Sequence, residues 1–393
     1  MAKNTHLEHL EDDILNQGSQ GGRNAIAFLR SLGKMLSSGD SGMRVTTKWD
    51  GAPAVICGIN PDNGKFFVGT KSVFNKVNPK ICYSEADVDA IYPSGGLNEK
   101  LKTSYRYLSQ LGITGVVQGD LLFTNDKYRT VIKNQNMIAF TPNTITYAVP
   151  IDSEIGRRVM NAKMGIVFHT TYHGPSISTM SASFGAKVGG SADVFVTSAE
   201  FDNTSGQANF NPQEKTQYES LVNRAEGSLK QCSRFLDMIS GTDKFAFNTL
   251  FKQFFNTYIR SGSGLGNVNS VSRDFANYYT SILDKEIASK KTKTAQDKYL
   301  QIKTNGLKFI SSNQSQIYFA VASYMNLQKC KDFVIRKLQQ VNTIGTFLKT
   351  DNGYRVTAPE GFVAIKSGSA LKLVDRLEFS RANFTAAKNW DQG

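Results

Sequence analysis

The fold depends on one stretch, Val45-Thr46-Thr47-Lys48-Trp49-Asp50-Gly51-Ala52-Pro53. Polar and apolar residues alternate up to Lys48, which predicts a half-buried strand, and Asp50-Gly51 and Pro53 then predict a turn. Residues two apart in an extended chain point to the same side, so Lys48 and Asp50 share a face. A lysine beside a carboxylate at a strand end can act as a nucleophile if its amine is neutral when it attacks. The alternative is a surface ion pair that precedes a turn.

A β-hairpin is predicted directly after this turn. Two apolar runs, Ala54 to Ile59 and Phe66 to Gly69, are joined by the turn-forming residues 60–64. The second run leads into Thr70-Lys71-Ser72, which places the cation of Lys71 at the end of the hairpin. Apolar residues at helical spacing predict helices within residues 5–38 and a helix-rich connector at residues 84–111.

Two further apolar strands carry residues of chemical interest. Gly115 to Phe123 predicts a buried strand that is interrupted by Gln118 and Asp120. A carboxylate inside an apolar strand is costly unless it belongs to a site or is paired, for example with a core lysine. The second strand, Gly165 to Tyr172, contains Phe168, whose ring could belong either to the core or to a ligand contact.

A helical segment follows, from Pro212 to about Leu348, because apolar residues recur there at spacings of three and four. Residues 211–350 contain 20 Lys and Arg residues against 10 Asp and Glu residues, a net charge of +10 out of the +13 of the whole chain. The densest basic run includes Lys290, Lys291 and Lys293. A solvated helix face is the alternative, but too few acidic residues balance this run, so we expect it to contact nucleic-acid phosphates.

Strand patterns return near the C-terminus, at residues 354–357, Glu360 to Lys366 and Ala370 to Asp375. Taken in chain order, the motifs resemble those of the covalent nucleotidyltransferase superfamily, which comprises ATP-dependent DNA ligases, RNA ligases and mRNA capping enzymes. Lys48-Trp49-Asp50-Gly51 is similar to the Lys-x-Asp-Gly signature of motif I, whose lysine takes up a nucleotide. The resemblance covers roughly residues 40–170 and 350–380.

The resemblance implies roles for individual residues. Lys48, Asp50 and Lys372 would be catalytic, with Lys48 bonded covalently to AMP and Lys372 neutralising the α-phosphate. Glu360 of motif IV and Asp120, which stands where motif III has a glutamate, would bind a divalent ion, Mg²⁺ or Mn²⁺. The residues that would contact the nucleotide are Thr47, Lys71, Asp120, Phe168, Phe362 and Lys366.

For the purine of the nucleotide, the resemblance implies an aromatic ring from motif IIIa. Phe168 is the first candidate for this ring and Tyr172 is the second. Phe362 and Val363 would line the other side of the purine.

The implied fold is α+β, with a nucleotidyltransferase core of antiparallel, ATP-grasp-like sheets and a large basic all-α insert between motifs IIIa and IV. We expect the first part of the core in residues 1–210, the insert in residues 211–350 and the second part of the core in residues 351–393. The insert would bind nucleic acid. Only about twenty residues follow the last motif, so we expect no C-terminal OB-fold.

The implied function is that of an ATP-dependent RNA or DNA ligase, closer to RNA ligases because the OB-fold is missing. It would use ATP and join nucleic acids that carry 5′-phosphate and 3′-hydroxyl ends. Two alternatives stay open. One is a nucleotidyltransferase of the capping or protein-modifying type, which forms the lysine adduct without sealing strands. The other is a non-catalytic nucleic-acid-binding protein on the same fold.

The composition indicates which kind of partner and which compartment suit the protein. A net charge of +13 over 393 residues suits a polyanionic partner. Four cysteines without paired spacing favour a reducing compartment, and no apolar run reaches the length of a membrane span. His169 and His173 are four residues apart, but no cysteine or acidic cluster beside them completes a zinc pattern. We therefore expect a monomeric cytoplasmic protein without a membrane segment.

Overall fold

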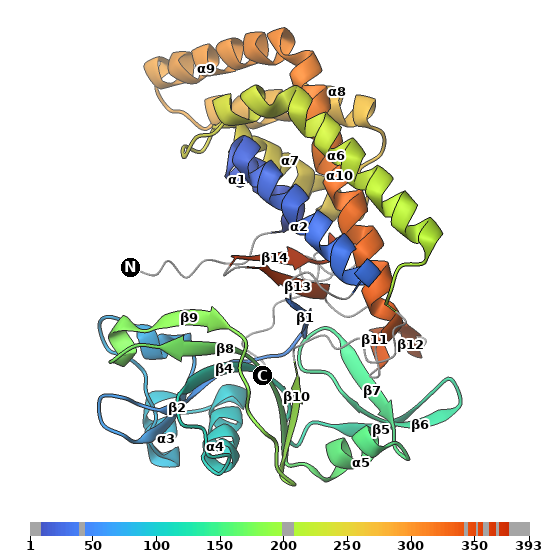
Figure 1. Cartoon of the computed structure of the whole chain (residues 1–393). Coiled ribbons are helices and arrows are strands. Elements are labelled where there is room, and N and C mark those ends of the chain that lie inside the picture. The colour runs from blue at the N-terminus through green and yellow to red at the C-terminus, as the bar shows by residue number, and fades with distance from the viewer. Residues whose placement is uncertain are drawn as a thin grey trace.

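A computed structural model describes residues 9–38, 44–198, 208–341, 345–350, 353–356, 361–366 and 369–376. Within these ranges, most of the long helices lie together on one side of the molecule and most of the strands on the other (Figure 1). The expected mixture of helices and antiparallel sheets is therefore confirmed. None of the helices in the described ranges has an apolar stretch long enough to cross a lipid bilayer.

A six-stranded sheet contains the hairpin that was predicted after Lys48. Its strand order is β10-β8-β4-β2-β3, and β9 pairs with β8. The strands are β2 (Ala54–Ile59), β3 (Phe66–Gly69), β4 (Val116–Phe123), β8 (Met164–His173), β9 (Ser181–Phe184) and β10 (Val194–Ser198). The bounds of β2 and β3 agree with the predicted hairpin. All neighbouring strands are antiparallel except β10, which runs parallel to β8.

One face of this sheet is covered by α3 (Glu85–Ile91) and α4 (Gly96–Leu108), which confirms the predicted helix-rich connector. Alternate residues of the strands, such as Val55 and Val117, pack there with Leu101 and Leu108 of α4. The opposite face carries Gln118 and Asp120, because successive residues of a strand point to opposite sides.

A five-stranded sheet of order β12-β11-β7-β6-β5 packs beside the first. Its strands, with the helix α5 that covers them, are β5 (Tyr128–Ile132), β6 (Gln135–Phe140), β7 (Thr146–Pro150), α5 (Glu154–Asn161), β11 (Gly345–Thr350) and β12 (Gly353–Val356). Phe123 and Phe140 join the two sheets, with ring centroids 4.9 Å apart. Since β11 belongs to a sheet, the helical segment ends near residue 341 and not near the predicted Leu348.

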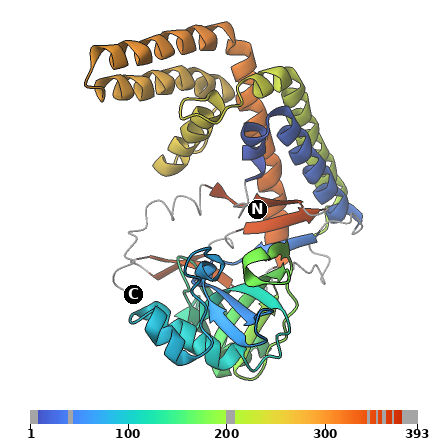
Figure 2. The same cartoon turned by 90° about the vertical axis from the view of Figure 1, so that its left-hand side faces the viewer.

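The predicted helical segment consists of five long helices. They are α6 (Pro212–Met238), α7 (Phe247–Ser261), α8 (Val268–Ala288), α9 (Lys293–Ser312) and α10 (Gln314–Leu338), followed by the short 3₁₀ turn η4 (Gln339–Val341). Asn211 caps α6 in a reciprocal pair of hydrogen bonds with Glu214. Helices α8 and α9 run side by side and project from the other helices (Figure 2).

The N-terminal elements η1 (Leu10–Asp12), α1 (Asp13–Asn16) and α2 (Gly18–Ser38) pack on these helices and not on the large sheets. The hydroxyl of Tyr218 in α6 donates to the carbonyl of Leu29 in α2 at 2.7 Å. The amide of Ser19 donates to the carboxylate of Asp237 at 2.7 Å. Residues 9–38 therefore pack with the helical part, whereas the prediction grouped the N-terminal helices with the first part of the core in residues 1–210.

A three-stranded sheet of order β1-β13-β14 lies between the helices and the two larger sheets (Figure 1). Its strands are β1 (Arg44–Lys48), β13 (Gly361–Lys366) and β14 (Ser369–Leu373). One of its faces joins the core of the helices through Val45, Phe362, Leu371 and Leu373. The sheet that contains Lys48 is thus built from both ends of the chain.

Candidate functional site

Lys48 and Lys372 lie on the same face of the three-stranded sheet. Lys48 pairs with Gly361, and Val363, two residues further along β13, pairs with Lys372. Paired residues share a face and residues two apart share a face, so the register places both lysines on one side. The residues of the other side, including Phe362, pack into the helical core. The two predicted catalytic lysines therefore share one face of this sheet, on strands that β13 separates.

The lysine face points toward the six-stranded sheet. Val374 follows β14 on this face and shares a core cluster with Leu122 and Val167 of the six-stranded sheet. The turn after Lys48 also rests on that sheet: a Cβ added at Gly51 would lie 2.6 Å from the Cβ of Asp120. Only glycine allows this close approach, which brings the segment after Lys48 onto the strand that carries Asp120.

Beside Asp120, the same face of the six-stranded sheet carries polar groups of β4 and β8. The hydroxyl of Tyr172 donates to Oε1 of Gln118 at 2.7 Å. Burial raises the pKa of Tyr172, which keeps this hydroxyl protonated as a donor. The ring centroid of Phe74, in the 3₁₀ turn η2 (Lys71–Phe74), lies 4.6 Å from the ring centroid of Tyr172. Lys71, at the start of this turn, is exposed.

A β-bulge directs His169 toward Asp120. Gln118 pairs with Thr170 and Gly119 pairs with Phe168, so His169 lies between two pairs without a partner of its own. Its Nε2 lies 3.4 Å from Oδ1 of Asp120, and its Nδ1 lies 2.8 Å from Oγ1 of Thr170. In the sequence, His169 is notable only for its spacing from His173, because the alternation of a strand does not reveal a bulge.

Asp50 lies in a buried network of hydrogen bonds. Its carboxylate is only 6% exposed and accepts hydrogen bonds from Nδ2 of Asn143 at 2.7 Å and from the amides of Thr144 and Ile145 at 2.7 and 2.8 Å. These three donors attach the segment after Lys48 to the loop before β7. The carboxylate of Asp50 therefore holds the segment after Lys48 in place, and its catalytic role stays a prediction.

We expect Asp50→Ala to lower the free energy of unfolding by about 3 kcal/mol, because buried amide donors lose their charged acceptor. The isosteric Asp50→Asn keeps one acceptor oxygen and should lose less. Urea unfolding of the two variants and the wild type measures both values. An alanine variant that unfolds at the wild-type urea concentration would contradict this role.

Three of the residues that were predicted to contact the nucleotide lie away from the faces that carry Lys48 and Asp120. Phe168 is 3% exposed and packs in the cluster under α3 and α4, on the face opposite Asp120. Phe362 is fully buried in the helical core, and Thr47, its partner in β1, shares that face. Side-chain contact with a nucleotide held beside Lys48 does not fit these three positions. Tyr172, the second candidate, and Val363 lie on the faces that carry Asp120 and Lys48.

Glu360 lies outside the described residues, and Lys366 is described only as the last residue of β13. Gly361 pairs with Lys48 and has a φ of +147°, and a side chain there would collide with the carbonyl of Leu373.

Within the described ranges, no group of three or more His, Cys, Asp or Glu side chains could hold a metal ion. The carboxylate of Asp120 still suits Mg²⁺, which usually takes one or two carboxylates together with water and phosphate oxygens.

The three lysines predicted to bind nucleic acid lie where α8 leads into α9: two of them follow α8, and Lys293 is the first residue of α9. Nζ of Lys290 is 2.6 Å from the carboxylate of Glu286 and 4.7 Å from the ring centre of Tyr299. Lys291 and Lys293 are exposed. Lys290 is therefore held by its neighbours, and the other two extend from the projecting pair of helices.

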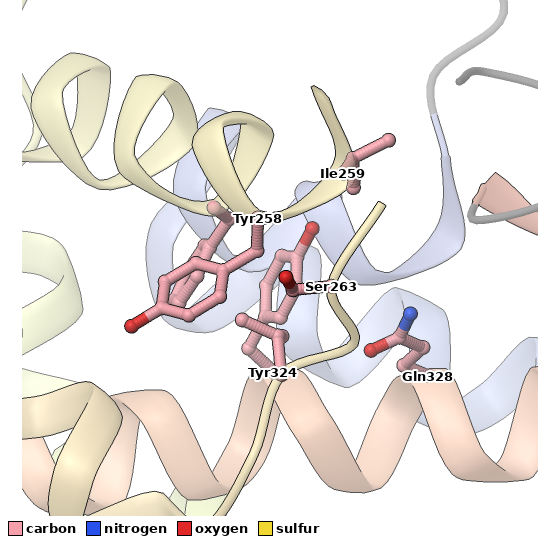
Figure 3. A pocket seen from close by; sticks show the side chains of 7 residues that line it. Tyr258, Ile259, Ser263, Tyr324 and Gln328 are labelled. Atoms are coloured by element: carbon pink, nitrogen blue, oxygen red, sulfur yellow. The ribbon is translucent and has the colours of Figure 1, made fainter. Parts of the chain in front are cut away.

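A small pocket in the helical part contains none of the predicted site residues (Figure 3). It lies between α7 and α10, and its lining includes Tyr258, Ile259, Tyr324 and Gln328. The hydroxyl of Tyr324 is already used in a hydrogen bond to Asp12 at 3.0 Å. The pocket has no charged lining residue that would attract a nucleotide.

Comparison with known proteins identifies a family. The profile of a family of unknown function (DUF6267) matches residues 4–388, and the chain therefore belongs to this family. No curated protein and no solved structure matches the chain.

Proposed function

We propose that this member of the DUF6267 family is an ATP-dependent polynucleotide ligase that works through AMP bound covalently to Lys48. The observation that supports this most is the register of the three-stranded sheet, which puts Lys48 and Lys372 on one face. This face is directed toward the strand of Asp120. A nucleophile, a fixed cation and a carboxylate in one place are the groups that nucleotidyl transfer needs.

In the first step, Nζ of Lys48 attacks the α-phosphorus of ATP. A phosphorus–nitrogen bond forms, the bond to the β-phosphate breaks, pyrophosphate leaves, and the amine releases its proton to solvent. Lys372 stabilises the charge that develops on the α-phosphate oxygens. Asp120, together with Glu360, would hold a Mg²⁺ or Mn²⁺ ion, which supplies further positive charge next to the phosphates.

In the second and third steps, AMP passes from Lys48 to a 5′-phosphate and is then displaced by a 3′-hydroxyl, which seals the strands. The exposed lysines of α8 and α9 would hold the phosphate backbone. The test is incubation with α-labelled ATP and Mg²⁺ or Mn²⁺, followed by a panel of 5′-phosphorylated RNA and DNA strands. Label that stays on the denatured protein supports the first step, and joined strands support the ligase. Label without joining would favour the alternative nucleotidyltransferase.

The exposed lysines give a prediction about salt. If Lys291 and Lys293 each contact one phosphate of a single strand, replacing both by glutamine should reduce the slope of log affinity against log salt by about 1.4. Strand sealing should slow, whereas adduct formation on Lys48 should persist because these lysines lie in the helical part. Fluorescence anisotropy over a salt series measures the slope.

Lys290→Gln is the matched control, because the amine of Lys290 is already paired with Glu286. This variant should change the slope less than either neighbouring substitution. An unchanged slope in the double variant would mean that Lys291 and Lys293 form a solvated face. Equal loss of adduct formation and sealing would mean that they support the nucleotide site.

A further inference from the structure

We propose that Asp120 and His169 together hold a divalent ion of the first transition series, such as Mn²⁺, in preference to Mg²⁺. The inference starts from the contact between these two side chains. Nε2 of His169 is buried and makes no hydrogen bond within the described residues, although Oδ1 of Asp120 lies only 3.4 Å away. Two groups of this kind normally share a proton in a well-aligned hydrogen bond.

The other ring nitrogen explains why a cation fits between them. Nδ1 of His169 lies 2.8 Å from Oγ1 of Thr170, and a proton on Nδ1 can be donated to this oxygen. Nε2 then carries a lone pair that faces the lone pairs of Asp120. Metal-binding histidines typically use one nitrogen for the ion and fix the ring by a hydrogen bond from the other.

The separation also agrees with a shared ion. Two ligand atoms bonded at roughly 2.1 Å to one ion are about 3.0 Å apart in adjacent octahedral positions and about 3.4 Å apart in tetrahedral ones, so the observed 3.4 Å lies within a few tenths of an ångström of either geometry. His169 reaches this position through the bulge in β8, which turns its ring toward Asp120. Water and phosphate oxygens would complete the coordination, because two protein ligands alone do not fill it.

The nitrogen ligand determines the kind of ion. Mg²⁺ prefers oxygen ligands, whereas an imidazole nitrogen favours the later ions of the first transition series, and Mn²⁺ accepts both. That this ion assists AMP transfer rests on the proposed function. Its binding can be measured without nucleotide, so failure of adduct formation and failure of metal binding are distinguishable.

The experiment titrates the full chain with Mn²⁺ in the absence of ATP and follows the free ion by electron paramagnetic resonance, with Mg²⁺ as competitor. The wild type should bind Mn²⁺ with an affinity well above that for Mg²⁺. His169→Ala should weaken Mn²⁺ binding by about tenfold or more, and Thr170→Val, which frees the ring, by about tenfold. With Co²⁺, the wild type should show an absorption band that His169→Ala lacks.

His173→Ala is the matched control, since His173 lies at the exposed end of the same strand and contacts Ser183. It should bind Mn²⁺ like the wild type. His169→Asp tests the ligand type: it should keep an ion but lose the preference for Mn²⁺ over Mg²⁺. Circular dichroism verifies that each variant is folded. Wild-type protein without Mn²⁺ binding, or a folded His169→Ala variant with wild-type affinity, would overturn the inference.

Discussion

Replacing Lys48 by alanine is expected to abolish the covalent AMP adduct completely. Lys372, the other lysine that the register places on this face, is two strands away and is expected to bind the α-phosphate, so it does not replace the nucleophile. Intact-mass measurement after incubation with ATP and Mn²⁺ should show a gain of one AMP in the wild type and none in Lys48→Ala. A variant that still gains one AMP would disprove the role of Lys48.

Two controls separate the loss of the nucleophile from the loss of charge. Lys48→Arg keeps the positive charge but not the nucleophile, because a guanidinium stays protonated in proteins, so it should form no adduct either. Lys372→Ala should still form the adduct, slowed by about 10²-fold or more, which is the usual cost of losing one electrostatic contributor. Equal loss in Lys48→Ala and Lys372→Ala, with no adduct at long times, would leave the nucleophile unassigned.

The second large effect concerns a buried ion pair that joins the N-terminal helices to α10. Nζ of Lys331 in α10 lies 2.6 Å from Oε1 of Glu11 in η1, and both side chains are fully buried. Next to this pair, Nη1 of Arg376 lies 3.0 Å from Oδ1 of Asp12. The cluster therefore ties the N-terminal helices to α10 and to the residues that follow β14.

This cluster reaches the candidate site. His9, whose pKa is held well below its ordinary value by burial and by the nearby cations Arg376 and Lys331, pairs with Lys372 in an isolated bridge. The position of Lys372 thus depends on the same buried groups.

We expect Lys331→Met to lower the free energy of unfolding by about 3 kcal/mol, because the buried carboxylate of Glu11 loses its hydrogen-bonded partner and keeps only the more distant Arg376, at 4.0 Å. The double variant Glu11→Leu with Lys331→Met should recover most of this loss, since apolar side chains can replace a buried pair at little cost. Urea unfolding followed by circular dichroism measures the differences.

The control is Arg106→Met, which breaks the exposed ion pair between Arg106 and Glu85 and should leave the unfolding midpoint nearly unchanged. If Lys331→Met unfolded like the wild type, or if the double variant were as unstable as the single one, the pair would not stabilise the packing of the N-terminal helices on α10.

Some features of the molecule could be predicted from the sequence because they depend on neighbouring residues. The hairpin of β2 and β3 was placed correctly because two apolar runs flank a cluster of turn-forming residues. The helices α6 to α10 were recognised from spacings of three and four. The strand that ends at Lys48 and the turn after it follow from alternation and from Asp50-Gly51.

Other features were decided by contacts between residues far apart in the chain. Asp50 meets Asn143 across 93 positions, and Glu11 meets Lys331 across 320 positions. No pattern of neighbouring residues in the sequence predicts such distant pairs. The N-terminal helices could equally have covered a sheet, and their packing on α6 follows from the shape of the assembled core.

The site depends on both kinds of information. The alternation of polar and apolar residues predicts which residues of one strand share a face, but it does not predict which element covers that face. Phe168 and Phe362 were correctly placed in strands, yet each ring points to the side that a helical layer covers. The approach of His169 to Asp120 needs a bulge in β8, which adds one residue to the strand and shifts the alternation. The local pattern therefore determines the elements and their faces, whereas the packing of distant elements decides which faces enclose the site.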